Sequence, residues 1–315
     1  MQSVRFAFVL LLLLAQPSAG FAQDQKPAIP PAKSASCSLF ATAITGDSSL
    51  VGDGAGIQAR LLAIYNAQAR LVRSMKAVAI IHATRGPKFG DKAGTSHPIT
   101  GFFNFEQPAL MRVTGVVPPM GRKVFDLSSD GRDFHLLAPD HDIMKHYVGL
   151  VDASPDMSEI KVPEISDIAR PREILDALRW QEGTLRKSKE AFPEGNVVVD
   201  FDLPARGGKS ITGKLLFDAQ TGAIASLQIY GADGELMSEL FYADWQPLND
   251  PAGGSPQGCF PHRVRLMQPM EDVQLDFRFL ELTLNPRIPR ANFRLSPAPG
   301  TPVVRLSPAG AIRNH

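Results

Sequence analysis

Residues 196–203 read NVVVDFDL, and residues 273–279 read VQLDFRF. In the first stretch apolar side chains recur at every second position, with Asp200 and Asp202 between them. The second stretch repeats the pattern, and residues 211–218 (ITGKLLFD) follow it closely. A period of two is typical of a strand with one buried and one solvated face. These stretches therefore predict a sheet with one apolar face.

Similar runs occupy most of the chain and are separated by turn residues such as Gly86-Pro87 and Asp130-Gly131. Consecutive strands with short connections should pair antiparallel. About a dozen of them predict one strongly curved sheet or barrel. The predicted strands are 78–84, 99–106, 110–117, 123–128, 133–137, 143–148, 196–203, 210–217, 223–230, 236–245, 261–267 and 273–284, with a last short run at 303–306.

Two amphipathic helical segments are predicted to cover the apolar face of this sheet. The first spans 56–75, where apolar residues recur near a 3.6-residue period and Asp53 is a candidate cap. The second spans 166–179, with Pro171 suited to the first turn of its main helix. The expected fold is therefore mainly β with a helical lid (α+β). In it, a strongly curved antiparallel sheet forms an open half-barrel covered by amphipathic helices.

The N-terminal residues predict export. Arg5 precedes the apolar run FAFVLLLLL at 6–14, and Gly20 and Ala22 suit the −3 and −1 positions of a signal peptidase site. Residues 1–22 are therefore interpreted as a secretory signal peptide, too short for a spanning helix. An N-terminal membrane anchor is the alternative. We expect a soluble mature protein outside the cytoplasm.

The remaining chain divides into a flexible arm at 23–52, one sheet domain at 53–306 and a loose tail at 307–315. The 33 basic and 32 acidic residues of the full sequence nearly balance, which argues against nucleic acid as a partner. Cys37 and Cys259 could form a disulfide in an oxidising compartment. Alternatively Cys37 carries a lipid, which would make the chain an outer-membrane lipoprotein.

Catalytic motifs are absent from the sequence. It contains no G-x-S-x-G elbow, no S-x-x-K set of the β-lactamase type and no Walker loop, and residues 52–56 (GDGAG) lack the dinucleotide spacing. Residues 140–142 (DHD) and His146 offer zinc-type ligands. However, His141 and His146 straddle a predicted turn, so a solvated loop is the preferred interpretation. We predict a non-enzymatic protein without metal or cofactor.

Residues 99–148 carry an ordered set of motifs. A glycine-led aromatic strand runs into Gln107-Pro108, Arg112 follows on the next strand, and then come Ser129-Asp130-Gly131 and Ala138-Pro139. The double hairpin at 217–245 (FDAQTGAIASLQIYGADGELMSELFYADW) and the ending at 285–304 complete the set. Together these segments resemble the periplasmic lipoprotein carriers of the LolA/LolB type, over roughly residues 56–305.

The resemblance implies a half-barrel with a helical lid and a hydrophobic cavity that shields acyl chains of lipoproteins or lipids. It also implies a role in outer-membrane lipoprotein sorting or envelope lipid traffic, with an inner-membrane donor and an outer-membrane acceptor as partners. The best-known carriers have an arginine just before the proline of the second strand, which helps to latch the lid. Gln107 stands there in this chain, so that role is not carried over. The chain also has extra length around 154–192 and 247–258.

The expected acyl-chain contacts lie on one face of the early strands and on the first helix. A one-residue slip in register would turn the opposite strand face inward. The main alternative is an envelope structural or interaction protein whose core is filled, and in either case we expect a monomer. The predicted ligand-binding residues are Leu61, Ile64, Leu71, Phe103, Phe105, Met111, Val113, Phe125 and Leu127.

Overall fold

The computed structural model describes residues 54–86, 94–95, 97–119, 121–141, 143–152, 159–160, 163–186, 196–206, 209–218, 223–247 and 259–307. All of them belong to one compact unit that spans Ala32–His315. The predicted signal peptide, the arm at 23–52, Asp53 and all of the tail beyond Ser307 lie outside the described residues. Among the described helices, none combines the length and apolarity needed to cross a bilayer.

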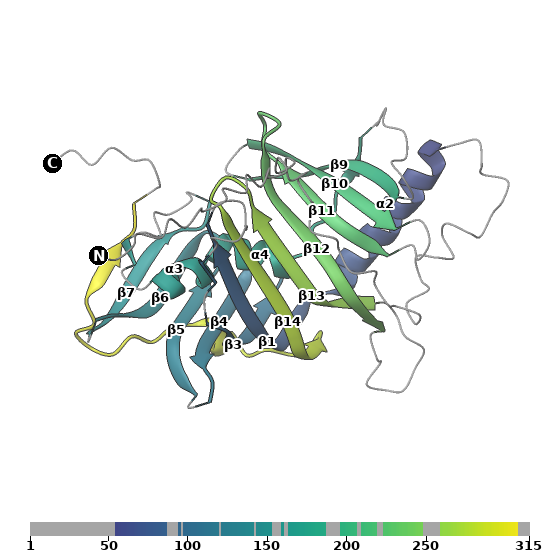
Figure 1. Ribbon diagram of the computed structural model, residues 1–315. Coiled ribbons are helices and arrows are strands. Elements are labelled where there is room, and N and C mark those ends of the chain that lie inside the picture. Colours follow the sequence, from purple (N-terminus) through teal and green to yellow (C-terminus); the bar gives the residue numbers. More distant parts are fainter. Residues whose placement is uncertain are drawn as a thin grey trace, which may run out of the picture. The chain divides into compact units, whose positions relative to one another are not determined.

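Strands dominate the fold, and a few helices lie against them (Figure 1). The strands are β1 (Ser74–Arg85), β2 (Gly94–Thr95), β3 (Ile99–Glu106), β4 (Leu110–Val117), β5 (Arg122–Ser129), β6 (Asp133–Asp140), β7 (Ile143–Leu150), β8 (Thr184–Leu185), β9 (Asn196–Arg206), β10 (Lys209–Asp218), β11 (Ile224–Tyr230), β12 (Leu236–Pro247), β13 (Cys259–Gln268), β14 (Val273–Leu284) and β15 (Val303–Arg305). The helices are α2 (Gly54–Leu71), α3 (Pro163–Ile168), α4 (Pro171–Leu178) and the 3₁₀ turn η4 (Arg290–Phe293).

One sheet contains all fifteen described strands. Its order is β15-β7-β6-β5-β4-β3-β1-β14-β13-β12-β11-β10-β9-β8, and β2 pairs with β1 outside this path. Strands that are neighbours in the sheet pair antiparallel, except that β15 pairs parallel to β7. Strand β1 joins the two halves, because it pairs with β3 on one side and β14 on the other. The path ends at β15 and β8, so the predicted open, largely antiparallel sheet is confirmed.

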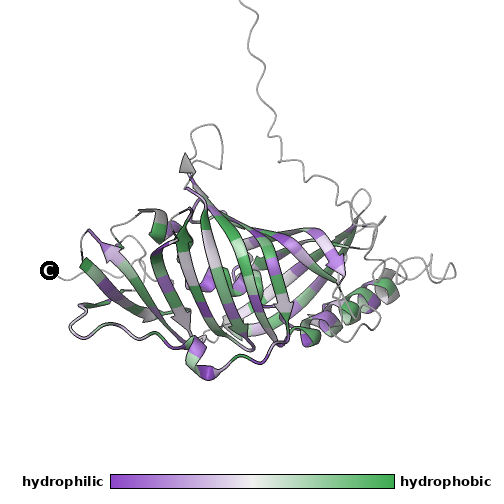
Figure 2. Ribbon diagram, turned by 90° about the horizontal axis from the view of Figure 1, so that it is seen from below, coloured by the Kyte–Doolittle hydropathy of each residue, from purple (hydrophilic) through white to green (hydrophobic). Residues whose placement is uncertain are grey.

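The register of the early strands brings one apolar row onto one buried face. Directly paired positions run across six strands, and every side chain in the row is buried. Hydrophobic and hydrophilic residues alternate along these strands (Figure 2). This is the face on which the ligand residues were predicted. The row consists of Ala77, Phe103, Val113, Leu127, Leu136 and Tyr147.

Helix α2 ends at Leu71, so the prediction of a helix to Met75 was wrong. Met75 lies in β1, paired with Phe105 and Leu284. Two side-chain amides take the place of a continued helix. Gln107 Nε2 donates to the carbonyls of Ala69 and Val72, and Asn285 Nδ2 donates to the carbonyl of Leu71. These bonds satisfy carbonyls that a helix end leaves without intrahelical partners.

The helical region predicted at 166–179 consists of two helices. Helix α3 begins at Pro163, ahead of the predicted start, and α4 begins at Pro171. Arg170 between them has an extended backbone, with φ −93° and ψ 104°. The proline ring sterically disfavours the helical conformation for the residue before it, which explains the break between α3 and α4. Pro171 occupies the predicted first turn of α4.

The helices contact different parts of the sheet. Helix α2 lies along β8 and β9, α3 contacts β1, and α4 contacts β5 and β13. Polar side chains of α2 also bond strand backbones: Gln58 donates to the carbonyl of Val198, and Gln68 to that of Cys259. Whether any of these helices acts as a lid stays a prediction.

Candidate functional site

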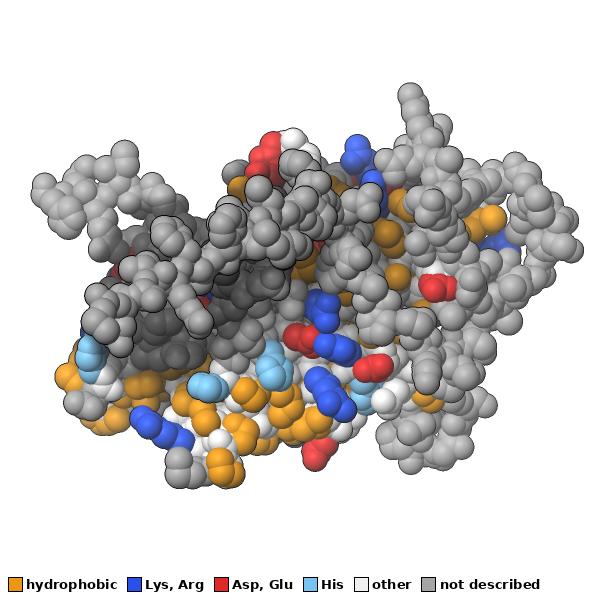
Figure 3. All heavy atoms as spheres, in the orientation of Figure 1, with side chains coloured by type: hydrophobic (Ala, Val, Ile, Leu, Met, Phe, Trp, Pro, Cys, Tyr) orange, Lys and Arg blue, Asp and Glu red, His pale blue; other side chains and the backbone are white. Residues whose placement is uncertain are grey.

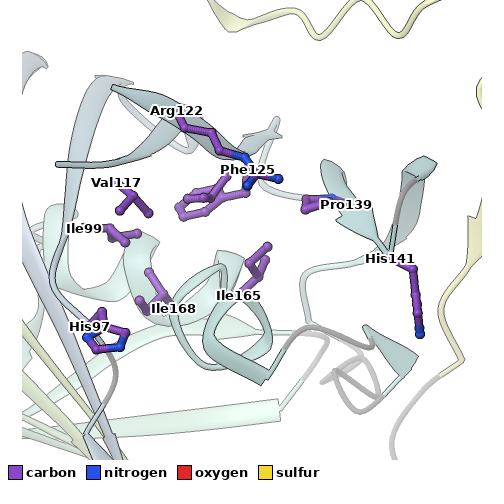
Figure 4. A pocket seen from close by; sticks show the side chains of 10 residues that line it. His97, Ile99, Val117, Arg122, Phe125, Pro139, His141, Ile165 and Ile168 are labelled. Atoms are coloured by element: carbon purple, nitrogen blue, oxygen red, sulfur yellow. The ribbon is translucent and has the colours of Figure 1, made fainter. Parts of the chain in front are cut away.

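An apolar pocket opens at one edge of the early sheet. Because β3 to β6 run antiparallel, the start of β3, the end of β4, the start of β5 and the end of β6 meet at this edge. Helix α3 contributes two isoleucines, and Figure 4 shows Ile165 and Ile168 turned toward Ile99, Val117 and Phe125, while His141 points away. The pocket has a volume of about 390 Å³. It is lined by His97, Ile99, Val117, Arg122, Val124, Phe125, Pro139, His141, Ile165 and Ile168.

The Phe125 ring occupies space that a side chain on β4 would otherwise fill. Gly115 pairs directly with Phe125, and a Cβ atom added at Gly115 would lie 2.3 Å from Cε1 of the ring. The ring therefore lies over the bare backbone of Gly115 and forms one wall of the pocket. Val117 and Val124 on the same two strands remain half-buried at the rim.

Ion pairs hold α3 and its junction with α4 on the sheet. Asp167 on α3 pairs with Arg85 on β1 at 2.8 Å. Arg170, which is almost fully buried, donates to Glu271 in the β13–β14 turn and to Gln268 Oε1 at 3.3 Å. Gln268 Nε2 in turn donates to Glu173 Oε1 at 2.9 Å. These contacts fix the chain that carries Ile165 and Ile168.

Burial and charge act oppositely on this network. Burial raises the pKa of Glu173 and outweighs the opposing effect of the Arg170 guanidinium. For Arg170 burial lowers the pKa, but the neighbouring carboxylates of Glu173 and Glu271 raise it by more, so the net shift is upward. Arg170 therefore stays charged inside the protein. A buried charge of this kind requires its partners, so the α3–α4 junction has a defined position.

The polar residues at the rim are basic or titratable. Arg122 and His97 are exposed, and His141 Nδ1 lies 2.8 Å from Asp140 Oδ1. Lys145 also donates to Asp140, and these two neighbours lower the pKa of the Asp140 carboxyl. No acidic side chain is among the ten that line the pocket.

The predicted ligand residues lie mainly in the packed core rather than around this pocket. Seven of the nine are at most 2 % exposed, and Ile64 and Leu71 are half-buried. Only Phe125 among them lines the pocket. Their contact with a ligand stays a prediction, and the structure places seven of the other eight in or against the core, while Leu71 is half-buried at the end of α2.

A series of buried aromatic rings links strands of the two halves of the sheet. Phe103 contacts Phe279, with ring centroids 6.2 Å apart, and Phe279 contacts Phe260 at 6.1 Å. The series continues through Trp180, whose ring lies 6.1 Å from Phe260 and 5.6 Å from Tyr65. Each of these side chains is buried. Among these rings there is packed core, and the apolar pocket lies apart from them at the sheet edge.

Sequence reasoning missed most of the pocket. Ile165 precedes the predicted start of the second helix, and Arg122 precedes the predicted start of its strand. A usable signal was present: the isoleucines are spaced three apart after Pro163, as on one helix face. Arg122 directly follows the turn residues of the β4–β5 hairpin.

The histidine cluster considered as a metal site is arranged differently. His146 Nε2 lies 3.0 Å from His135 Nδ1 on β6, and His141 contacts Asp140. Burial, followed by the proximity of His135, lowers the pKa of His146. Within the described ranges no group of three or more His, Cys, Asp or Glu could hold a metal ion. Asp142 and Cys37 lie outside those ranges, so the pairing of Cys37 with the buried Cys259 stays a prediction.

Exposed apolar side chains lie on the strands near the pocket. Ile143 and Met144 on β7 follow the turn that contains His141, and Val303 lies on β15. Their exposed fractions are 57 %, 43 % and 60 %. Figure 3 shows hydrophobic side chains over this end of the sheet.

Comparisons with known proteins give similarity in structure but not in sequence. No family model matches the chain, and no curated protein matches it. A LolA superfamily protein from Nitrosomonas europaea is 13% identical with a TM-score of 0.47, and the match covers 74% of this chain and 97% of that one. A DUF1329 family protein from Desulfovibrio piger is 14% identical with a TM-score of 0.45, covering 77% and 98%.

A third similar structure is described as an outer membrane lipoprotein-sorting protein domain from Vibrio parahaemolyticus. It is 10% identical with a TM-score of 0.44, and the match covers 75% of this chain and 94% of that one. Two of the three names correspond to the resemblance that the sequence motifs indicated. At these identities and scores, function has to be argued from the residues of this chain.

Proposed function

We propose that this protein binds an acyl chain, of a lipid or a lipoprotein, in the apolar pocket between the β3–β6 edge and α3. The observation that carries the proposal is the lining itself: seven of ten side chains are apolar and converge on about 390 Å³. Small-molecule sites are commonly concave, mainly apolar and about 300–1,000 Å³ in volume. We further propose that the protein acts in the periplasm, in lipoprotein sorting or envelope lipid traffic, without catalysis.

Burial of apolar surface supplies the binding energy. Each methylene group removed from water contributes about 0.8 kcal/mol. The half-buried Val117 and Val124 at the rim and the buried Ile168 and Phe125 further in form a continuous apolar path. A bound acyl chain can lie along this path without displacing the buried aromatic rings of the interior. Helix α3, which contributes Ile165 and Ile168 to the lining, is the part of the predicted helical lid on which the proposal depends.

Native mass spectrometry of protein purified from the periplasm, before and after mild delipidation, tests the proposal. We expect bound species of lipid mass that delipidation removes, and uptake of a fluorescent fatty-acid probe afterwards. Val117→Trp should fill the pocket mouth and weaken probe binding. Val78→Trp is the matched control, because Val78 is also half-buried but does not line the pocket. A clean apo mass together with no probe uptake would contradict the proposal.

The packed aromatic rings of the interior favour a second candidate, an envelope structural or interaction protein. The observation behind it is the buried ring series from Phe103 to Tyr65, whose neighbouring members pack against one another. If the chain purifies without lipid and takes up no probe, this candidate becomes the preferred one. Chemical cross-linking in intact cells would then identify its partner.

A further inference from the structure

We infer that the ligand of this pocket is an anionic amphiphile, and that Arg122 recognises its acidic headgroup. The inference rests on the proposed function, because it assumes that the pocket takes the acyl chain. It adds the chemical class of the headgroup, a carboxylate or a phosphate, and the residue that distinguishes it from an uncharged acyl group.

The described side chains that line the pocket carry charge of one sign only. Among the described residues that line it are one arginine and two histidines, and none of these residues is an aspartate or a glutamate. His141 is already bonded to the Asp140 carboxylate, which Lys145 also neutralises. Arg122 is therefore the lining residue whose positive charge is permanent, since a guanidinium does not lose its proton in proteins.

Nearby cations are committed to other partners, and Arg122 is not. Arg112 and Lys123 both pair with Asp126, each at 2.9 Å. Within the described parts of the chain, Arg122 has no ion pair or side-chain hydrogen bond, and it is exposed. An unpaired exposed arginine is ordinary on a protein surface. Arg122 differs from such surface arginines because it lies beside an apolar pocket, where the acidic headgroup of a bound amphiphile could pair with it.

The position follows from strand register. Arg122 begins β5 and pairs directly with Val117, which ends β4 and lines the pocket mouth. Figure 4 shows the Arg122 side chain beside Phe125, across the pocket from His97. An acyl chain bound along Val117 and Phe125 would leave its headgroup at the rim, next to this guanidinium. The planar guanidinium suits carboxylate and phosphate, because it donates two parallel hydrogen bonds to either.

A set of ligands with one acyl chain and different headgroups tests the inference. Oleate, 1-oleoyl-lysophosphatidate and 1-oleoylglycerol, each below its micelle concentration, are titrated by calorimetry against the delipidated protein. We expect the anions to bind about fivefold tighter than the neutral glyceride, which corresponds to a favourable solvent-exposed ion pair. The stronger of the two anions identifies carboxylate or phosphate as the preferred headgroup.

Arg122→Gln should abolish this preference and leave the affinity for 1-oleoylglycerol unchanged. Arg278→Gln is the control, because Arg278 is exposed on β14 and does not line the pocket; it should behave as the parent protein. Equal affinity of the parent for all three ligands, or a preference that survives in Arg122→Gln, would overturn the inference and leave acyl binding intact. Absence of binding to all three would instead overturn the proposed function.

Discussion

The ring of Phe125 lies against the backbone of Gly115, where any larger residue would place its Cβ atom 2.3 Å from ring carbon Cε1. The two residues pair directly across β4 and β5. An aromatic side chain over a strand glycine covers backbone that would otherwise lack packing. This contact sets the position of one pocket wall, because the Phe125 ring forms that wall. Phe125 is also the one predicted ligand residue that lines the pocket.

Gly115→Ala should therefore displace the Phe125 ring toward the pocket. We expect the free energy of unfolding to fall by about 1–3 kcal/mol, the usual cost of overpacking a core, and fatty-acid affinity to fall with it. Urea unfolding and probe titration measure the two effects. In the double variant Gly115→Ala/Phe125→Leu the smaller side chain should relieve the clash, so its cost should be less than the sum of the single costs. Strict additivity would contradict the contact.

Gln107 has a structural role at the end of α2. Its Nε2 atom donates to the carbonyls of Ala69 and Val72. Gln107→Ala should lower the free energy of unfolding by about 1–2 kcal/mol, because two carbonyls lose their protein donor. Gln246→Ala is the control, since Gln246 is exposed on β12. Equal stability of the two variants in urea would show that the helix end does not depend on this amide.

The C-terminal segment is tied to the sheet through a buried carboxylate. Asp126, whose side chain is 3 % exposed, accepts two bonds from the Arg112 guanidinium and one from Lys123. Arg112 Nη1 also donates to the carbonyl of Arg294 at 3.0 Å. Burial raises the pKa of Asp126, but the bonds from Arg112 and Lys123 together outweigh burial and hold it below its ordinary value of 3.8.

The shifted pKa predicts a pH dependence of stability. Because the folded pKa lies below the unfolded one, the carboxylate contributes stability that is fully present well above pH 3.8 and is lost as pH falls through the folded pKa. Asp126→Ala should cost about 3 kcal/mol at neutral pH, where it leaves Arg112 without its partner. The difference from the parent should shrink in urea melts below pH 3.8. The exposed Asp202 gives the control Asp202→Ala, for which little change is expected. A pH-independent cost at Asp126 would contradict the assignment.

Local pattern predicted most strands well, because alternation reports directly which face is buried. The stretch at 273–284 and β14 have the same bounds, as do the stretches at 99–106 and 110–117 and strands β3 and β4. The pairing of β1 with β14 joins residues about two hundred positions apart, and no local pattern in the sequence specifies it. The predicted end of α2 was wrong for a similar reason. The side chains that hydrogen-bond to the observed end, Gln107 and Asn285, are distant from it in sequence.

The candidate site was less accessible to sequence reasoning than the fold. Alternation identifies buried residues such as Phe103 and Met111, but it does not distinguish a packed core from a cavity wall. The pocket depends on where α3 comes to lie, which is set by the Arg85–Asp167 pair and by Arg170. Those contacts cross between elements and have no signal in the sequence of either one.

A crystal structure with a terminally brominated fatty acid tests the central claim most directly. The anomalous signal of bromine locates the end of the acyl chain without assumptions about the rest of the ligand. We predict a single strong peak inside the pocket, between Phe125 on β5 and Ile168 on α3. A peak elsewhere in the molecule, or none at a concentration that saturates binding in solution, would show that this pocket does not hold the acyl chain.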